Sequence, residues 1–206
     1  MIGRDSLTGL VLAGGLGRRM QGAAGHDGEV EKGLLVLNGL PLVDHAQRFL
    51  ARHAGKILIS ANTHRDAYEN YGTVVPDEPQ LGDYSGPLAG VASALACSTT
   101  PWMVVMPVDV TGLPEDLVPR LLEAVSDDGA HIAYARTRNS VHPLCMVLHR
   151  TSRQSLCEFL LAGERKVQLW QRQNGAAAVL FEDADHAFFN INTPQDLLQA
   201  RGGLRG

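Results

Sequence analysis

The residues best suited to chemistry lie in a glycine-rich stretch near the amino terminus and in a lysine that follows it. The stretch runs Leu12-Ala13-Gly14-Gly15-Leu16-Gly17-Arg18-Arg19-Met20, and the lysine is Lys32. Glycine has no Cβ and tolerates positive φ, so the backbone N–H groups of such a loop can face an anion. Arginine and lysine add fixed positive charge. The combination predicts a binding site for a polyphosphate, and therefore for a nucleotide.

Two better-known glycine loops do not match this stretch. The Walker loop closes on Gly-Lys-Ser or Gly-Lys-Thr, which does not occur at the required distance. The dinucleotide fingerprint G-x-G-x-x-G would begin at Gly15 and Gly17, but its third glycine position holds Met20. The alternative interpretation is a tight turn from strand to helix with arginines on the surface, which would be sufficient if only the Gly-Gly pair were present. The coincidence of glycines and cations favours the phosphate site over that turn.

A second candidate is Asp109, which follows the apolar run Trp102 to Met106. Open α/β sheets bind ligands outside the carboxyl ends of their parallel strands, so an aspartate there is the chain's best metal-ligand candidate. An aspartate that caps a helix or forms a turn fits the same position equally well. Asn62 and Asp77 also follow apolar runs and are expected at the same edge, where an amide and a carboxylate can bond to the nucleoside part of a nucleotide.

The hydrophobic pattern alternates between short apolar runs and segments of helical period. Strands are predicted at 7–13, 56–62, 73–75, 102–106, 132–135, 144–148 and 178–181, and helices at 41–50, 88–96, 114–125, 152–162 and 167–173. Thr193 is predicted to cap a final helix, with Pro194 at its first position and Asp196 three residues after the cap. Strand, helix, strand is the beginning of a parallel sheet, so we expect an α/β fold.

Length and composition narrow the class of protein. The 206 residues suit a single domain, and the net charge of −4 predicts no bulk attraction to nucleic acid or to a membrane. Cys97, Cys145 and Cys157 are widely spaced without a C-x-x-C pair, so we expect free thiols in a reducing compartment. The apolar segment 7–13 is too short to span a bilayer. These features predict a cytoplasmic protein, and we expect a monomer.

Over nearly its whole length the sequence resembles the molybdenum cofactor guanylyltransferases. The glycine stretch with Lys32-Gly33 is shared with a wider superfamily of nucleotidyltransferases. The narrower resemblance rests on Gly163-Glu164-Arg165-Lys166-Val167 and on Phe189-Asn190-Ile191-Asn192-Thr193-Pro194. It implies a single-domain, three-layer, Rossmann-like nucleotidyltransferase fold with a mostly parallel central sheet. It further implies that the part before about residue 110 binds nucleotide and that about 111–200 bind molybdopterin.

The activity that the resemblance implies is transfer of GMP from Mg²⁺-GTP to molybdenum-molybdopterin, with release of pyrophosphate. Contact with maturation proteins of molybdoenzymes is also implied. Arg19, Lys32 and Asp109 are the implied catalytic residues, and Asp109 is the implied magnesium ligand. The implied GTP contacts are Leu12, Ala13, Gly14, Gly15, Lys32, Asn62, Asp77 and Asp109. The implied molybdopterin contacts are Arg165, Lys166, Asn190 and Asn192, although Arg165 and Lys166 alone look like a solvated helix start.

The sequence also departs from the family pattern between Met20 and Lys32. The family places its lysine five positions after the methionine and an aspartate before the lysine, whereas here the spacing is twelve and the preceding residue is Glu31. The longer segment, Gln21 to Glu31, has few apolar anchors and is expected to be mobile without ligand. Its carboxylates, Glu31 among them, would repel GTP phosphates, so we expect its middle to face solvent. His142 is interpreted as a turn or substrate-side residue.

Three other functions remain compatible with these residues. One is a cytidylyltransferase of the same architecture that uses CTP, and another is a sugar-1-phosphate nucleotidyltransferase. The third is a carrier without catalytic activity that binds molybdopterin or nucleotide, and the altered segment before Lys32 is its best support. Pyrophosphate release with each triphosphate distinguishes them.

Overall fold

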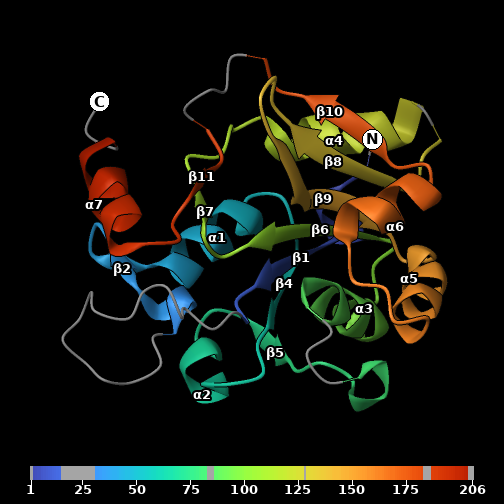
Figure 1. The fold of residues 1–206 in the computed structure, drawn as a ribbon, viewed down its shortest axis with the longest axis horizontal. Helices are drawn as coiled ribbons and strands as arrows, with labels where there is room; N and C mark the ends of the chain where they lie inside the picture. The colour runs from blue at the N-terminus through green and yellow to red at the C-terminus, as the bar shows by residue number, and fades with distance from the viewer. Residues whose placement is uncertain (1, 15–30, 83–85, 128, 183–186, 204–206) are drawn as a thin grey trace.

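A computed structural model of the chain describes residues 2–14, 31–82, 86–127, 129–182 and 187–203. Within them, seven strands form one sheet in the order β10-β8-β9-β6-β1-β4-β5 (Figure 1). Their bounds are β1 Leu7–Leu12, β4 Lys56–Ser60, β5 Thr73–Val75, β6 Trp102–Pro107, β8 Ile132–Arg136, β9 Val141–His149 and β10 Ala177–Leu180. All neighbouring pairs are parallel except β6 with β9 and β8 with β9. The mostly parallel sheet predicted from the sequence is therefore confirmed.

Helices cover both faces of the sheet and make three layers. The bounds are α1 Leu42–Ala51, α2 Arg65–Tyr68, α3 Pro87–Cys97, α4 Leu117–Asp127, α5 Ser152–Leu161, α6 Val167–Gln173 and α7 Pro194–Gly203. Val11 of β1 belongs to the buried apolar cluster that includes residues of α1 and α4, whereas Leu10 and Leu12 belong to the cluster that includes residues of α3 and α5. Because successive side chains of a strand point to opposite faces, a strand covered on both faces is buried along its whole length, as β1 is.

Short elements join these layers. They are the 3₁₀ turns η1 Arg4–Ser6, η3 Lys32–Leu34 and η4 Pro79–Leu81, and the strands β2 Val36–Leu37, β3 Leu40–Pro41, β7 Val110–Thr111 and β11 Phe189–Asn190. Phe189 pairs with Thr111 and Asn190 with Val110 in an antiparallel ladder. This ladder ties the chain near residue 190 to the end of β6, although the two are far apart in the sequence (Figure 1).

Helix α3 lies unusually close to β4 at Gly90. A Cβ built on Gly90 would lie 2.2 Å from Ser60 Oγ and 3.1 Å from Ser60 Cβ. Gly90 is buried, and its neighbours Ala89 and Val91 have no exposed surface. Only a residue without a side chain allows this approach. The close packing fixes α3 against the carboxyl end of β4.

Several predicted boundaries differ from those observed. Strand β9 begins at Val141, three residues earlier than predicted, because it pairs with both β6 and β8. Helix α4 begins at Leu117, after a turn in which Leu117 N–H donates to Pro114 O. Pro41 is the cap of α1 and lies outside the helix. Among the described residues, no helix is long and apolar enough to cross a membrane.

Candidate functional site

The predicted residues Lys32, Asp109 and Asn192 meet at the carboxyl edge of the central strands. Lys32 Nζ donates to Asp109 Oδ2 at 2.6 Å and to Asn192 Oδ1 at 2.7 Å. The side chains of Lys32 and Asp109 are 14% and 23% exposed, so the ion pair is partly shielded from water. The electrostatic attraction within such a shielded ion pair is stronger than that within a pair at the surface. It must also offset a larger free-energy cost of removing the two charges from water.

The strand register explains why these three residues meet. Strands β1 and β6 lie side by side with Leu12 opposite Pro107, so Asp109 emerges beside the end of β1. Val108 N–H donates to Leu12 O, and Ile191 N–H donates to Asp109 O. The backbone that carries Asn192 is thereby bonded directly to the backbone that carries Asp109.

The start of α7 holds Asn192 from the other side. Asp196 Oδ2 accepts bonds from the N–H groups of Asn192 and Thr193 at 2.9 and 2.8 Å, and Asp196 N–H donates to Thr193 Oγ1. This is the capping box predicted from the sequence, and it is confirmed. The Asn192 N–H, aided by Thr193, holds the pKa of Asp196 below its ordinary value. The carboxylate therefore stays ionised as a cap throughout the neutral range.

Asn62 and Asp77 form a reciprocal pair on the neighbouring strands. Asn62 Nδ2 donates to Asp77 Oδ2 at 3.0 Å, and Asp77 N–H donates to Asn62 Oδ1 at 2.9 Å. They follow β4 and β5, which are adjacent and parallel, so both lie at the same edge as Asp109. The second oxygen of Asp77 and the second N–H of Asn62 can still bond to ribose or base.

The described part of the glycine stretch differs from the expected anion cradle. The N–H groups of Ala13 and Gly14 both donate to Ser60 O at 3.0 Å. These two amides are used to join the end of β1 to β4, so they do not face a ligand. Gly15, Arg18 and Arg19 lie outside the described residues, as does most of the segment Gln21 to Glu31 whose mobility was expected. Leu12 and Ala13 are buried, and Gly14 is exposed.

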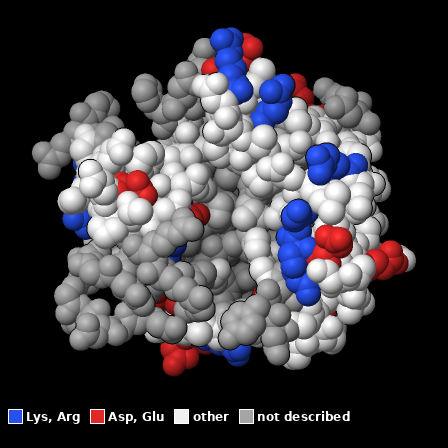
Figure 2. Space-filling view, viewed as in Figure 1, with Lys and Arg blue, Asp and Glu red and all other residues white. Residues whose placement is uncertain are grey.

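The predicted molybdopterin contacts fall into two groups on opposite sides of the sheet. Asn190 and Asn192 lie beside α7, whereas Arg165 and Lys166 lie between α5 and α6 (Figure 1). Arg165 Nη1 donates to Leu160 O and Glu164 O, so it also closes the end of α5. The face of the molecule seen in Figure 2 is hollowed at its centre, and Lys and Arg side chains lie to the right of the hollow, over the region of α5 and α6, with Asp and Glu side chains beside them.

Two residues near the site behave differently from their sequence interpretation. His142 lies within β9, not in a turn, and its ring stacks on Phe188 at 4.3 Å between centroids. Burial lowers its pKa, which favours the neutral ring. Glu31 is not a loose carboxylate, because its side chain is only 8% exposed and accepts a bond from Tyr68 Oη. Its place directly before Lys32 is the one sequence signal that could have pointed to it.

The residues present are compatible with magnesium bound together with a triphosphate. Mg²⁺ in such sites takes one or two protein carboxylates, with the other ligands coming from phosphate and water. The described residues contain no group of three or more His, Cys, Asp or Glu side chains that could hold a metal by itself. Asp109 supplies a carboxylate at the expected edge, so the donor set fits a metal shared with substrate.

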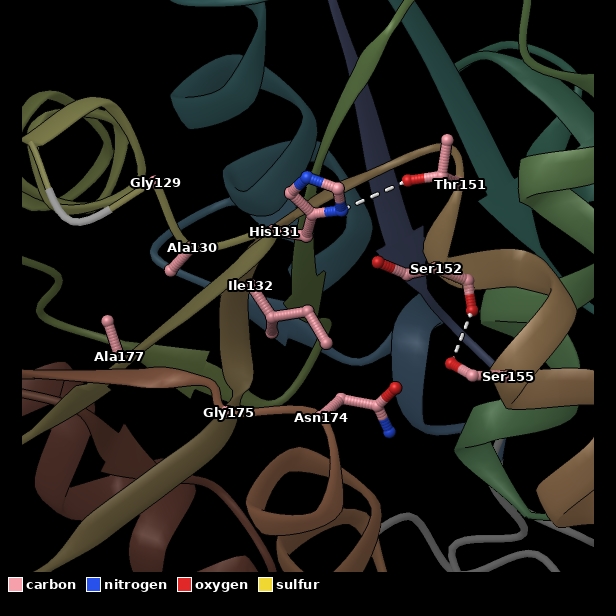
Figure 3. Close-up of a pocket in the computed structure, with 10 residues that line it drawn as sticks. All are labelled: Gly129, Ala130, His131, Ile132, Thr151, Ser152, Ser155, Asn174, Gly175 and Ala177. Atoms are coloured by element: carbon pink, nitrogen blue, oxygen red, sulfur yellow. Dashed lines mark hydrogen bonds between the residues drawn. The ribbon is translucent and has the colours of Figure 1, made fainter.

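A hollow of about 750 Å³ lies elsewhere on the molecule. His131 and Ala177 line it near the starts of β8 and β10, and Thr151 lines it just after the end of the antiparallel β9 (Figure 3). It is therefore at the amino-terminal edge of the parallel strands, opposite Asp109. Ligands of open α/β sheets bind at the carboxyl edge, so this hollow is not the candidate nucleotide site.

Comparison with known proteins gives a consistent family. Residues 9–178 match the model of the MobA-like NTP transferase domain. The chain is 40% identical over 202 residues to the molybdenum cofactor guanylyltransferase of Cupriavidus taiwanensis, covering 96% of this chain and 97% of that one. It is 40% identical over 204 residues to the molybdenum cofactor guanylyltransferase of Bordetella pertussis, covering 97% and 98%.

Solved structures agree on the fold. Molybdopterin-guanine dinucleotide biosynthesis protein A from Archaeoglobus fulgidus superposes with a TM-score of 0.73 at 21% identity, covering 96% of this chain and 98% of that one. The inositol-1-phosphate CTP transferase from T. maritima superposes with a TM-score of 0.73 at 15% identity, covering 100% and 98%. At these identities the likeness shows the fold alone. On the full-length sequence identity and the matched domain, the chain belongs to the molybdenum cofactor guanylyltransferase family of MobA-like NTP transferases.

Proposed function

We propose that this protein transfers GMP from GTP to molybdenum-molybdopterin, which yields the guanine dinucleotide cofactor and pyrophosphate. The observation that carries the proposal is the meeting of Lys32, Asp109 and Asn192 at the carboxyl edge of β1 and β6. Membership of a family whose relatives are named guanylyltransferases supports the choice of reaction and of GTP.

The reaction needs charge neutralisation more than it needs a protein base. An oxygen of the terminal phosphate of molybdopterin attacks the α-phosphorus of GTP, and the bond from the α-phosphorus to the bridging oxygen breaks, so pyrophosphate leaves with its electron pair. A phosphate monoester is already close to a dianion at neutral pH and needs no deprotonation. What two approaching anions require is in-line positioning and positive charge.

Lys32 and Asp109 fit those two requirements. The ammonium of Lys32 can exchange one of its present acceptors for a phosphate oxygen, because lysine has three donors on a flexible stem. Asp109 would hold Mg²⁺, whose chemistry there is to neutralise charge on the phosphates. Asn192 accepts from Lys32 and thus places a residue of the proposed molybdopterin side next to the proposed nucleotide side.

Asn62 and Asp77 are proposed to meet the nucleoside. Their reciprocal bonds fix both side chains, and fixed donors and acceptors discriminate better than mobile ones. Arg165, Lys166 and Asn190 are proposed to meet molybdopterin. The basic side chains on the α5 and α6 side of the hollow support an anionic partner there (Figure 2).

The test is a pyrophosphate-release assay with molybdopterin, magnesium and one triphosphate at a time. Release with GTP alone supports the proposal, and release with CTP alone replaces it with cytidylyl transfer. Absence of release with every triphosphate, in a protein that still binds molybdopterin, would establish a carrier. Sugar 1-phosphates replace molybdopterin in a parallel series, and turnover only in that series would contradict the proposal.

A further inference from the structure

Glu31 lies at the centre of a compact cluster of hydrogen-bond donors directly before Lys32. Tyr68 Oη donates to Glu31 Oε1 at 2.7 Å, Thr63 Oγ1 donates to Oε2 at 3.2 Å, and His64 Nδ1 lies 3.2 Å from Oε2. The Glu31 side chain is 8% exposed, and Tyr68 has no exposed surface. Burial, together with Glu31, raises the pKa of the Tyr68 hydroxyl, which therefore remains a protonated donor.

Tyr68 of the same cluster also packs closely against Gly33, the residue after Lys32. A Cβ built on Gly33 would lie 2.4 Å from Tyr68 Oη, so the backbone at Gly33 packs closely against the hydroxyl end of the tyrosine side chain. Glu31 is the residue that precedes η3, and its carbonyl accepts from Leu34 N–H at 3.1 Å. Side-chain bonds at Glu31 and close packing at Gly33 therefore hold the backbone on both sides of Lys32.

A buried carboxylate is costly unless its hydrogen bonds are satisfied, and here each oxygen has a donor. These contacts fix the position of the Lys32 backbone, from which the long lysine side chain extends. Lysine has a flexible four-carbon stem, so the place that its ammonium can reach depends on where the stem begins. From this origin Lys32 reaches Asp109 and Asn192 together.

We propose that Glu31, clamped by Tyr68, is a positioning residue that fixes the backbone of Lys32 so that its ammonium is aimed at the transferring phosphates. This inference rests on the proposed function and adds Glu31 and Tyr68 to the residues that serve it. Neither side chain touches substrate. Both act through Lys32, so they affect the transition state more than they affect binding of GTP.

The first test is kinetic. Tyr68→Phe removes only the hydroxyl, and Glu31→Gln removes only the charge, while Tyr71→Phe and Glu69→Gln in the same segment are matched controls. We expect Tyr68→Phe and Glu31→Gln each to lower kcat roughly 10-fold with a change in KM for GTP of less than about 3-fold. The controls should retain wild-type kcat. A loss confined to KM would overturn the inference.

A double-mutant cycle separates positioning from a merely structural role. If the clamp acts through Lys32, Tyr68→Phe should cause no further loss of kcat/KM in a Lys32→Ala background. An equal loss in both backgrounds would contradict the proposal, because it would mean that Tyr68 acts independently of Lys32. Thermal unfolding of every variant is measured alongside. If Tyr68→Phe does not fold, Thr63→Val removes one donor from the exposed side and takes its place in the cycle.

The second test does not depend on the reaction. Lys32 is shielded, whereas Lys56 and Lys166 are exposed, so pulse labelling of amines with acetic anhydride, followed by mass spectrometry, compares them in one sample. In Tyr68→Phe, labelling of Lys32 should rise several-fold relative to Lys56 and Lys166. Unchanged Lys32 labelling would overturn the clamp. A protein that shows this increase but no GTP-dependent transfer would retain the clamp and lose the proposed function.

Discussion

At the scale of single residues, the site consists of charges that neutralise one another. Lys32 donates to Asp109, and Asn62 pairs with Asp77, so each carboxylate of the site already has a partner. A substrate with several negative charges changes this balance, because it offers Lys32 new acceptors and, together with a metal, gives Asp109 a new cation. Substitutions that remove one charge therefore test the mechanism most directly.

Asp109→Asn should abolish transfer while the protein stays folded. The amide keeps the shape of the carboxylate but removes the charge proposed to hold magnesium, so we expect kcat to fall by roughly 10²–10³-fold or more. Pyrophosphate release across a magnesium titration measures this. Asp116→Asn, at an exposed aspartate before α4, is the control. Near wild-type turnover of Asp109→Asn at limiting magnesium would exclude Asp109 as the ligand.

Lys32→Ala should lower kcat by roughly 10²-fold, because a cation that stabilises charge in the transition state contributes mainly to turnover. Steady-state kinetics with GTP varied at saturating molybdopterin provide the measurement. Lys56→Ala is the control, because Lys56 is exposed at the amino-terminal end of β4. Unchanged kinetics in Lys32→Ala would mean that Lys32 serves only its ion pair with Asp109.

At the scale of elements, the site depends on contacts at the ends of helices and strands. The capping box at the start of α7 fixes Asn192, and the close approach of α3 to β4 fixes the strand end from which Asn62 follows. Both contacts are local in the structure, yet each decides where a functional side chain lies. Stability measurements on these contacts therefore also report on the site.

Gly90→Ala should destabilise the protein by about 1–3 kcal/mol, because the new Cβ would lie 2.2 Å from Ser60 Oγ in a tightly packed region. Adding Ser60→Ala should recover part of that loss, since it removes the oxygen nearest to the new methyl group. Urea denaturation gives both values. In contrast, Gly202→Ala on α7 has nothing within 4 Å of its Cβ and should not be destabilising. Equal effects at Gly90 and Gly202 would show that the close approach is relaxed in solution.

The loss of stability caused by Asp196→Ala should become smaller as the pH falls. The folded-state pKa of Asp196 lies below its ordinary value of 3.8, so its capping contribution is fully present above that value and is lost as the pH falls through the folded pKa. We expect the difference in unfolding free energy between wild type and Asp196→Ala to be about 1 kcal/mol at neutral pH and to shrink in acid. A difference independent of pH would show that the charge has no part in the cap.

At the scale of the whole molecule, one sheet joins the segments proposed for the two substrates. Strand β9, from the later part of the chain, lies between β8 and β6, and β6 borders β1. The antiparallel pairing of β6 with β9 therefore lies inside one continuous sheet and does not mark a boundary between domains. The division near residue 110 describes which substrate each part is proposed to meet, and the core does not divide there.

The full chain should accordingly unfold in one cooperative step, with coincident transitions by near-UV and far-UV circular dichroism. A fragment of residues 1–110 should not fold by itself, because β6 would become an edge strand and its apolar side chains, among them Val104 and Val105, would lose the partners that β9 supplies. Amide exchange of the fragment gives a direct measure. Protection of β1 and β6 in the fragment would instead indicate an independent nucleotide-binding domain.

The sequence by itself determined the fold class and the main elements, and it named candidate residues for the site. Short apolar runs located the main strands, and segments of helical period located the main helices. The residues after those runs pointed to Asp109, Asn62 and Asp77 as candidates, because the carboxyl ends of parallel strands share one edge. Lys32 was a candidate because it follows the glycine-rich stretch. The capping box was also predictable, since its residues are three apart in the chain.

The tertiary structure decided which residues touch. The contact of Lys32 with Asn192 spans 160 residues and depends on the β7 and β11 ladder, for which two-residue strands leave no pattern. The bonds of Ala13 and Gly14 to Ser60, and of Glu31 to Tyr68, likewise come from strand register and packing. Local sequence patterns indicate which residues are buried and where turns form. These pairings join segments that are far apart in the chain, so the strand register and the packing of the folded chain decide them.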